Sequence, residues 1–282
     1  MVAYERMPVT WVIEPNVFPA RYSAMEAAVR RAGHAVTRWK DDWWSTGSWP
    51  RLVGQSVVFH GSLGNAARIR SELPWSPGAY CDTAAFECSA WYSRARDWLL
   101  HRQWQTLPAN VLTANPEVAL QPLGLPDEVF VRPNSPLKPF AGRVLRRDRI
   151  TLAALDYGFY YDDPMIAVVV TPVRNIGQEW RYVVVSRRVV AGSAYEADGR
   201  VALPDDPAGQ PWAFASEVAA NLNPPEEVYV MDVCKADGRY WLLELNPFSG
   251  ADLYACSPDD VVAAISDAAQ QAAAQGGVAV DG

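Results

Sequence analysis

Lysine, histidine and cysteine are scarce in this 282-residue sequence, and it has no long apolar run. The longest such run, residues 165–170, is far too short for a membrane-spanning helix, which needs about 20 residues. The N-terminal stretch carries Glu5 and Glu14 and lacks the apolar segment of a secretory signal peptide. These patterns predict a cytoplasmic protein that does not enter the membrane.

The few cysteines and histidines also disfavour a zinc protein. The four cysteines show no CxxC spacing and the three histidines are scattered, so we expect reduced, mostly buried thiols. No Lys/Arg-rich block occurs and the formal net charge is -7, which disfavours a duplex nucleic-acid partner. Since only three of the 25 basic residues are lysines, a loop lysine such as Lys138 is a candidate for a specific role.

The first part of the chain alternates strand and helix patterns, which predicts an α/β, Rossmann-like domain over residues 1–125. A helix pattern that ends at Gly33 lies between two strand patterns, so the chain opens as β-α-β. We expect strands at 10–13, 34–39 and 57–60, and helices at 20–32 and 86–101.

Turn residues cluster at 122–126, where we place a domain boundary. Strand patterns dominate the remainder, residues 126–282. We expect strands at 129–132, 166–170, 181–185, 189–192, 228–233 and 240–245, and helices at 150–157, 212–222 and 259–275.

The strongest chemical pattern is a hairpin that contains Asp232 on one strand and Glu244 and Asn246 on the next, with an Ala-Asp-Gly turn between them. Side chains alternate along a strand, so Glu244 and Asn246 share one face. Carboxylate and amide oxygens suit Mg²⁺, which can bridge nucleotide phosphates. The alternative is an ordinary hairpin with surface acids, although carboxylates this close would repel one another without a cation.

The spacing Asp-x11-Glu-x-Asn resembles the metal-binding pattern of the ATP-grasp ligases. Residues 179–185 and 189–193 resemble a strand pair of that family, and residues 129–133 resemble the strand that ends in Lys-Pro in many members. The three matches follow the family order and cover about residues 126–258. The segments Arg132-Pro133, 136–140, 179–181 and 244–248 resemble its R-to-K (arginine-to-lysine) clade more closely.

The resemblance implies a pre-ATP-grasp domain over residues 1–125 and a two-lobed ATP-grasp domain over 126–282. The lid lobe would span about 126–165, and the metal and nucleotide lobe about 166–282. ATP and Mg²⁺ are the implied cofactors, with Asp232, Glu244 and Asn246 as metal ligands.

The implied phosphate contacts are Arg132 and Lys138. The sequence departs from the family here, because Arg132 replaces the usual lysine and the following loop is not glycine-rich. The alternatives are a structural salt bridge for Arg132 and a solvated loop position for Lys138.

The resemblance further implies that adenine pairs with the backbone of one strand, through the carbonyl of Val170 and the N–H of Val173. Arg181 would neutralise the transferring phosphoryl group, and Glu179 would orient it or face the ribose. The alternative for Arg181 is an ion pair across the sheet.

Substrate contacts are also expected where a strand ends and a helix begins, at His60 and Ser62, since N–H groups there favour an anion such as a carboxylate. A turn with a capping serine is an equally good reading. Ser249 and Gly250, in the loop after the metal strand, would face the acceptor substrate by resemblance.

These expectations lead to an ADP-forming carboxylate–amine ligase of peptide type that acts through an acyl phosphate. Its partners would be small-molecule or peptide acids and amines, without nucleic acid or membrane, and a homodimer is compatible with the sequence. The rivals are a phosphotransferase on the same scaffold and a nucleotide-binding module without turnover.

Overall fold

The structure, a computed structural model, describes residues 8–155, 163–194, 196–197, 200–201 and 209–277. The chain forms two compact units, each built from separate stretches of sequence. Unit 1 comprises Met1–Asp82, Gln178–Val233 and Glu244–Gly282, and unit 2 comprises Thr83–Gly177 and Cys234–Leu243.

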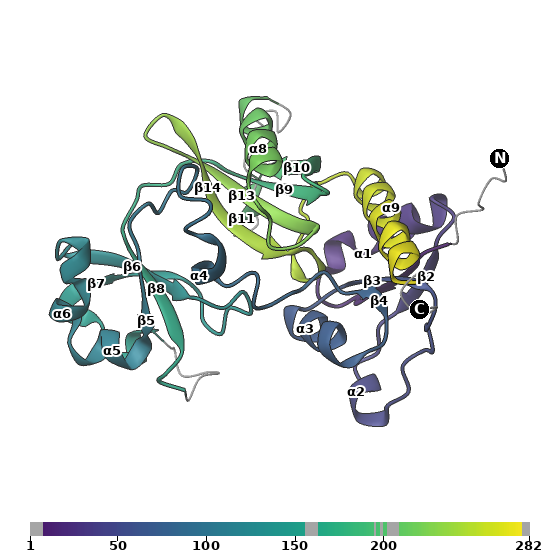
Figure 1. Cartoon of the computed structure of the whole chain (residues 1–282), viewed down its shortest axis with the longest axis horizontal. Helices are drawn as coiled ribbons and strands as arrows, with labels where there is room; N and C mark the ends of the chain where they lie inside the picture. The colour runs from purple at the N-terminus through teal and green to yellow at the C-terminus, as the bar shows by residue number, and fades with distance from the viewer. Residues whose placement is uncertain (1–7, 156–162, 195, 198–199, 202–208, 278–282) are drawn as a thin grey trace. The chain divides into compact units, whose positions relative to one another are not determined.

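Unit 1 contains a four-stranded parallel sheet, which confirms the predicted β-α-β opening (Figure 1). The strand order is β2-β1-β3-β4, and β1 is fully buried between its neighbours. The elements are β1 (Thr10–Ile13), α1 (Pro19–Arg31), β2 (Ala35–Arg38), β3 (Ser56–His60), α3 (Leu63–Glu72) and β4 (Ser76–Gly78). A short helix, α2 (Trp43–Thr46), precedes β3.

A second four-stranded sheet has the order β10-β9-β13-β14. Its strands are β9 (Glu179–Val185), β10 (Arg188–Ala194), β13 (Val228–Ala236) and β14 (Arg239–Pro247). The predicted hairpin is confirmed, because β13 and β14 are joined by Asp237 and Gly238, both with positive φ as in a type I′ turn. Two shorter strands, β11 (Glu196–Ala197) and β12 (Arg200–Val201), pair with each other.

Helix α9 (Pro258–Gly277) packs on both sheets within unit 1. Its Val261, Val262 and Ile265 join the core that contains Trp11 of β1. The Trp11 indole N–H donates to the Ser266 hydroxyl at 3.0 Å, so the first strand and the last helix are held together.

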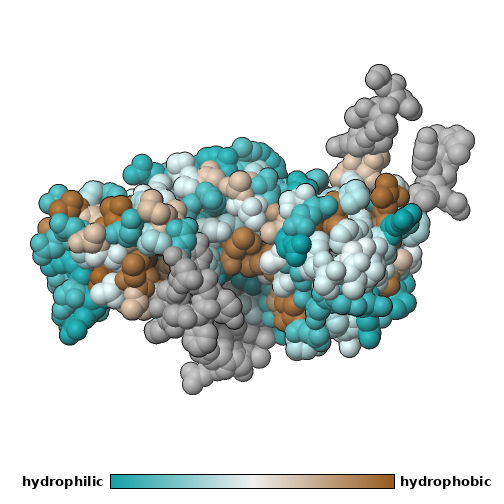
Figure 2. All heavy atoms as spheres, turned by 90° about the horizontal axis from the view of Figure 1, so that it is seen from below, coloured by the Kyte–Doolittle hydropathy of each residue, from teal (hydrophilic) through white to brown (hydrophobic). Residues whose placement is uncertain are grey.

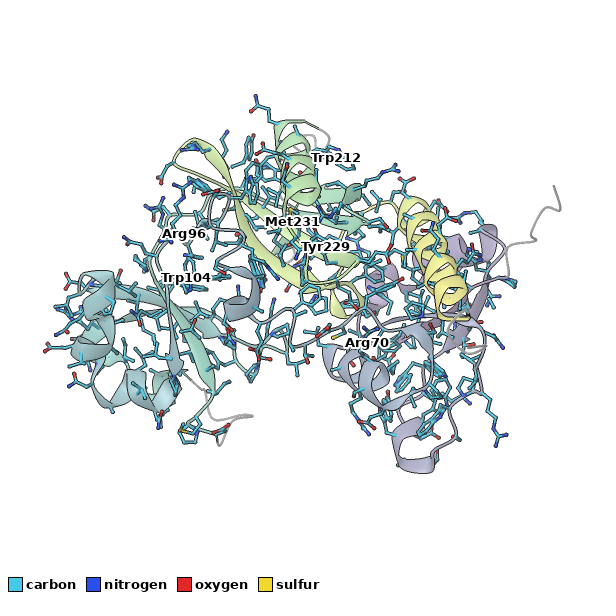
Figure 3. All side chains as sticks on the ribbon, in the orientation of Figure 1. Arg70, Arg96, Trp104, Trp212, Tyr229 and Met231 are labelled. Carbon is cyan, nitrogen blue, oxygen red and sulfur yellow. The ribbon has the colours of Figure 1, made fainter. Side chains whose placement is uncertain are left out.

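Helix α8 (Gln210–Asn221) covers the other face of the second sheet. Trp212 of α8 meets the Tyr182 ring edge-on at 5.8 Å, and Figure 3 labels Trp212 with Tyr229 and Met231 of the covered strand β13. The helices expected at 212–222 and 259–275 are therefore confirmed to within two residues at each end.

Unit 2 contains a sheet of order β5-β8-β6-β7, in which β8 is central and antiparallel to both neighbours. Val129, Val131, Val168 and Val170 point to one face and form its core with Leu112 and Leu120. The strands are β5 (Gln105–Pro108), β6 (Glu128–Pro133), β7 (Arg143–Arg146) and β8 (Ala167–Pro172). The helices are α5 (Ala109–Ala114), α6 (Pro116–Leu120) and α7 (Leu152–Leu155), with 3₁₀ turns at Gln121–Leu123 and Arg147–Arg149.

The helix expected over 86–101 is wrong, because only α4 (Cys88–Trp91) forms there. Long-range contacts hold the rest of this segment. Asn134 accepts from the Ser89 N–H at 2.9 Å, and Leu99 bridges to Leu242. The helix expected at 150–157 is also short among the described residues, and its last two positions lie outside them.

On the face shown in Figure 2, apolar residues occur as separate spots among hydrophilic ones, as single exposed apolar side chains usually do. None of the helices within the described ranges is long and apolar enough to cross a bilayer.

One largely buried acid of unit 1, Glu226, predicts that stability depends on pH. Glu226 accepts from the Asp82 N–H at 3.4 Å and lies 3.8 Å from Arg70 (labelled in Figure 3). Burial raises its pKa to about 7, from 4.5. The folded protein therefore holds this proton where the unfolded chain has lost it, so stability falls as pH rises from about 4.5 to 7.

We expect Glu226→Gln, which stays neutral, to be more stable than the wild type above pH 7, by about 3 kcal/mol. The two proteins should converge near pH 4, where both side chains are uncharged. Urea unfolding across pH 4–8 measures this, with Glu227→Gln as the neighbouring control. Parallel pH profiles for Glu226→Gln and the wild type would contradict the assignment.

Candidate active site

One face of the second sheet is apolar at one end and polar at the other. The apolar core of unit 1 contains side chains from this face: Val183 and Val185 of β9, and Val228 and Val230 of β13. Because side chains alternate, the next positions on this face are Arg181 and Glu179 on β9 and Asp232 on β13. The polar residues of the predicted site therefore lie on the same face of the sheet as these core valines, further along the strands.

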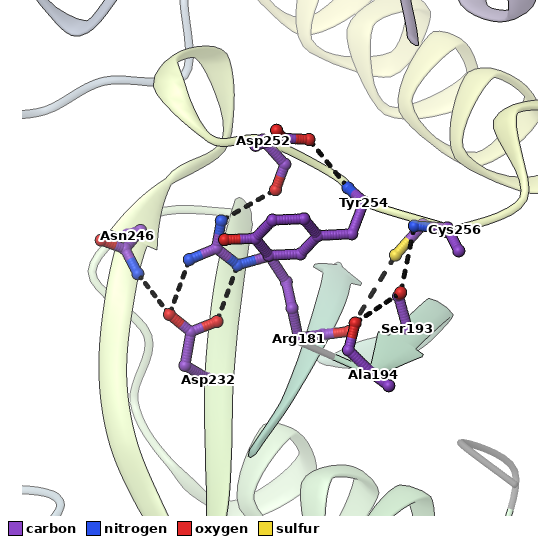
Figure 4. Close-up of polar contacts among 9 residues, drawn as sticks. Arg181, Ser193, Ala194, Asp232, Asn246, Asp252, Tyr254 and Cys256 are labelled. Atoms are coloured by element: carbon purple, nitrogen blue, oxygen red, sulfur yellow. Dashed lines mark hydrogen bonds and ion pairs between the residues drawn. The ribbon is translucent and has the colours of Figure 1, made fainter. Parts of the chain in front are cut away.

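Arg181 and Asp232 form a buried, two-pronged ion pair (Figure 4). Arg181 Nε donates to Asp232 Oδ1 and Nη2 donates to Oδ2, each at 2.8 Å. The two side chains are only 7% and 3% exposed. Arg181 Nη1 donates to the Asp252 carbonyl at 2.8 Å, so all three nitrogens of the guanidinium are engaged. The cross-strand ion pair considered as an alternative for Arg181 is therefore present.

Asn246 joins this pair through its amide. Asn246 Nδ2 donates to Asp232 Oδ2 at 3.0 Å, so Oδ2 accepts two hydrogen bonds and Oδ1 accepts one. A carboxylate has about four lone-pair sites, which leaves one on Oδ1 for a cation. Asn246 would have to rotate its amide to present oxygen to the same ion. With that rotation, the donor set fits a hard divalent cation.

Glu179 and Glu244 are half-buried neighbours of the pair. Burial raises the pKa of Glu179 to about 7, and the charges of Asp232 and Glu244 add to this, while Arg181 opposes it. Three acids thus face a single guanidinium, a charge balance that a divalent cation would restore. No set of three His, Cys, Asp or Glu side chains suited to a metal is found in the described part of the chain, so the amide of Asn246 is needed to complete the proposed ligands.

The nucleotide residues predicted in unit 2 lie on and beside its sheet. Arg132 is half-buried on the face of β6 opposite the core, next to Phe130, whose ring stacks on His101 at 5.7 Å. A side chain at Gly142 would collide with Phe130, so the loop after β6 packs back against this face. Lys138 of that loop is exposed and has φ of +49°.

Pairing within β8 bears on the expected adenine contacts. Val170 lies opposite Gln105 of β5 and Val131 of β6, so its backbone is directed at neighbouring strands. Val173 follows the end of β8 and is outside the ladder. This arrangement weakens the prediction for the Val170 carbonyl and leaves Val173 as the better placed of the two.

The four predicted substrate residues gather in one place in unit 1. The Ser249 carbonyl accepts from the Gly61 N–H at 2.8 Å, and Gly250 lies so close to Leu63 that any larger residue would collide with it. Ser249 is fully buried, and its hydroxyl accepts from the Tyr80 N–H at 2.9 Å. These contacts favour a structural role for Ser249 and Gly250.

His60 and Ser62 also make internal contacts. His60 Nε2 donates to the Ala251 carbonyl at 3.0 Å, and burial lowers its pKa to about 4, so its imidazole is neutral at pH 7. Ser62 caps α3 by accepting from the Asn65 N–H at 3.4 Å, as the alternative reading expected.

A carboxylate of the protein itself takes the predicted anion position. Glu14 Oε2 accepts from the Ser62 N–H at 2.8 Å and from Asn65 Nδ2 at 3.1 Å. A Cβ at position 61 would approach Glu14 to 2.5 Å, so only glycine fits there. Local sequence could not reveal this, because Glu14 arrives from the end of β1.

Two residues of the site were not identified from sequence. Asp252 and Tyr254 follow the 3₁₀ turn Phe248–Gly250, and both contact Arg181. Their only signal was their place in the loop after the metal strand, where the sequence favoured Ser249 and Gly250 instead.

Comparisons with known proteins agree on the fold. The chain resembles D-cycloserine synthetase DcsG, with a TM-score of 0.59, 14% identity, and coverage of 93% of this chain and 99% of that one. A D-alanine–D-alanine ligase from Bacillus anthracis, complexed with ATP, gives 0.59 and 12%, with 95% and 99% covered. The ATP-grasp ligase PsnB, complexed with a precursor variant, Mg and ADP, gives 0.54 and 14%, with 95% and 97% covered.

No curated protein matches the chain significantly by sequence. The model of an ATP-grasp domain, family 2 of the R-to-K clade, matches residues 113–264, which is more than half of the chain. The chain therefore belongs to the R-to-K clade of the ATP-grasp family.

Proposed function

We propose that the protein is an ATP-dependent, ADP-forming ligase that joins a carboxylate to an amine through an acyl phosphate. The proposal is carried by one observation: Arg181, Asp232 and Asn246 form a buried polar network beside Glu179 and Glu244, in a chain of the ATP-grasp family. Fold neighbours complexed with ATP, or with Mg and ADP, support ATP and Mg²⁺ as the cofactors.

In this proposal, Asp232, Glu244 and Asn246 hold the metal. Asp232 contributes through the remaining lone pair of Oδ1, and Arg181 fixes the carboxylate so that this lone pair keeps one direction. When bound, Mg²⁺ would neutralise negative charge on the phosphates. Glu179 is placed to orient the nucleotide.

The nucleotide phosphates are assigned to Arg132 and Lys138, and the adenine edge to Val173. The distribution of charged residues between the two units supports the assignment of the phosphates to unit 2. Unit 2 has 12 basic and 10 acidic residues, whereas unit 1 has 13 basic and 22 acidic ones. Unit 2 is thus the less acidic of the two, which favours contact of Arg132 and Lys138 with a polyanion.

The chemistry requires positioning more than a protein nucleophile. A substrate carboxylate oxygen attacks the γ-phosphorus, ADP leaves, and an acyl phosphate forms. The amine then attacks the acyl carbon and inorganic phosphate leaves with the carboxylate oxygen. Orientation and charge neutralisation by the residues above are the contributions that such a reaction needs.

The test is turnover with ATP, Mg²⁺ and pairs of amino acids or short peptides. We expect ADP and phosphate only when an acid and an amine are both present. Hydroxylamine in place of the amine should trap a hydroxamate, and ¹⁸O in the carboxylate should appear in phosphate. A phosphorylated product without free phosphate would instead indicate a phosphotransferase, and AMP would exclude the proposed reaction.

Lys138→Ala should weaken ATP binding or slow turnover, because a hydrogen bond to a charged group is worth about 1.5–3 kcal/mol. That range corresponds to about a 10- to 150-fold change in the dissociation constant. Calorimetric titration with a nonhydrolysable ATP analogue measures it. Lys40→Ala, at another lysine outside the proposed site, is the control, and equal affinity and rate in Lys138→Ala would remove Lys138 from the site.

The peptide or small-molecule nature of the substrates, the homodimer and the cytoplasmic location stay predictions. So does the division at about residue 125 into a pre-ATP-grasp and an ATP-grasp domain.

A further inference from the structure

The loop after β14 contacts the guanidinium of Arg181 through Asp252 and Tyr254 (Figure 4). The Asp252 carbonyl accepts from Arg181 Nη1 at 2.8 Å, and Arg181 Cζ lies 4.8 Å from the centre of the Tyr254 ring. Hydrogen bonds to Asp232 and Asp252 therefore fix the guanidinium, and its central carbon lies over the Tyr254 ring.

The loop that carries Tyr254 is itself anchored. The Ala255 N–H donates to the Ser193 hydroxyl of β10 at 3.0 Å, and the Tyr254 N–H donates to Asp252 Oδ1 at 2.9 Å. Leu253 and Cys256, on either side, are buried in the core of unit 1. Several contacts that do not involve Arg181 thus fix the backbone at Tyr254.

Tyr254 has φ of +47°, in the left-handed region that bulky residues seldom adopt. Such a conformation costs about 1–3 kcal/mol and persists only where its surroundings hold it. A glycine would avoid that cost.

We propose that Tyr254 is a positioning residue for the metal site. Its ring holds one face of the Arg181 guanidinium through a cation–π contact and keeps water from that face. Arg181 then stays in the two-pronged arrangement that aims the remaining lone pair of Asp232 Oδ1 at the cation. The inference rests on the proposed function, because it assigns Tyr254 to the same site.

The test compares Tyr254→Phe, which keeps the ring, with Tyr254→Leu, which keeps bulk without it, and Tyr254→Gly, which also removes the backbone strain. We expect Tyr254→Phe to retain kcat within about twofold. Tyr254→Leu and Tyr254→Gly should lose about tenfold in kcat with little change in the KM for ATP. Mn²⁺ binding in the presence of ADP, followed by electron paramagnetic resonance, should weaken by a similar factor in Tyr254→Leu and Tyr254→Gly.

The melting temperature separates this role from a structural one. Tyr254→Gly should lose Mn²⁺ affinity even where relief of strain keeps its melting temperature near that of the wild type. The matched control is Tyr22→Leu, since Arg38 lies 5.1 Å over the Tyr22 ring in another part of unit 1. It should bind Mn²⁺ as the wild type does.

Wild-type Mn²⁺ affinity in Tyr254→Leu would overturn the proposal for Tyr254. The binding measurement needs no substrate pair, so it separates the two hypotheses. A wild type that binds Mn²⁺ and ADP but releases AMP, or a phosphorylated product without free phosphate, would refute the proposed reaction. Weakened Mn²⁺ binding in Tyr254→Leu would still support the positioning role.

Discussion

Arg181→Ala is expected to lose about 3–5 kcal/mol of unfolding free energy, because it leaves the buried Asp232 carboxylate without its partner. That loss is a large share of a typical stability of about 5–15 kcal/mol. Arg181→Lys should recover part of it, since lysine keeps the charge but not the fork. Urea unfolding measures the effect, and single-turnover rates of the folded protein measure the catalytic share.

The double variant Arg181→Met/Asp232→Leu separates stability from chemistry. Apolar replacement of a buried ion pair is often neutral or stabilising, so this variant should regain stability yet stay inactive. Arg31→Ala is the control, because its pair with Asp259 is more than half exposed at both ends and should contribute about 0–1 kcal/mol. A loss below about 1 kcal/mol in Arg181→Ala would show that the pair does not stabilise the fold.

Glu244→Gln should keep the fold and lose about 10²–10³-fold in Mg²⁺-dependent turnover, since a metal contact that stabilises transferring charge is worth several kcal/mol. Loss of one negative charge beside Glu179 and Asp232 should leave stability equal or slightly higher. ADP release over a range of Mg²⁺ concentrations measures the effect.

Glu72→Gln, on the exposed surface of α3, is the control for a glutamate outside the site. It should turn over as the wild type does. If Glu244→Gln turned over as fast as the wild type at the same Mg²⁺ concentrations, Glu244 would be removed from the proposed metal ligands.

The hairpin of β13 and β14 was predictable from sequence because its signals are local. Alternating side chains and the Asp-Gly turn fix its register, and with it the shared face of Glu244 and Asn246. The helix expected over 86–101 failed because Asn134 and Leu242, far away in sequence, supply its hydrogen-bond partners. Such tertiary contacts override local propensity.

The site shows the same limit. Sequence placed Arg181 and Asp232 on strands of the right kind, but which strands are neighbours is a property of the fold, so their ion pair could not be deduced. The carboxylate expected from a substrate at the start of α3 is supplied by Glu14, 48 residues before Ser62.

The contact between Trp11 and Ser266 bears on how the protein is made. The two residues are 255 positions apart, so the core they share cannot close until the last helix has left the ribosome. Both stretches of unit 2, Thr83–Gly177 and Cys234–Leu243, are synthesised before α9, so unit 2 can fold before unit 1 is complete. During that interval the apolar side chains of the first strands are exposed to solvent. The contact between the first strands and α9 closes a large loop of chain, and such long-range contacts form slowly. Synthesis that stops before α9 should therefore yield a chain that aggregates or is degraded.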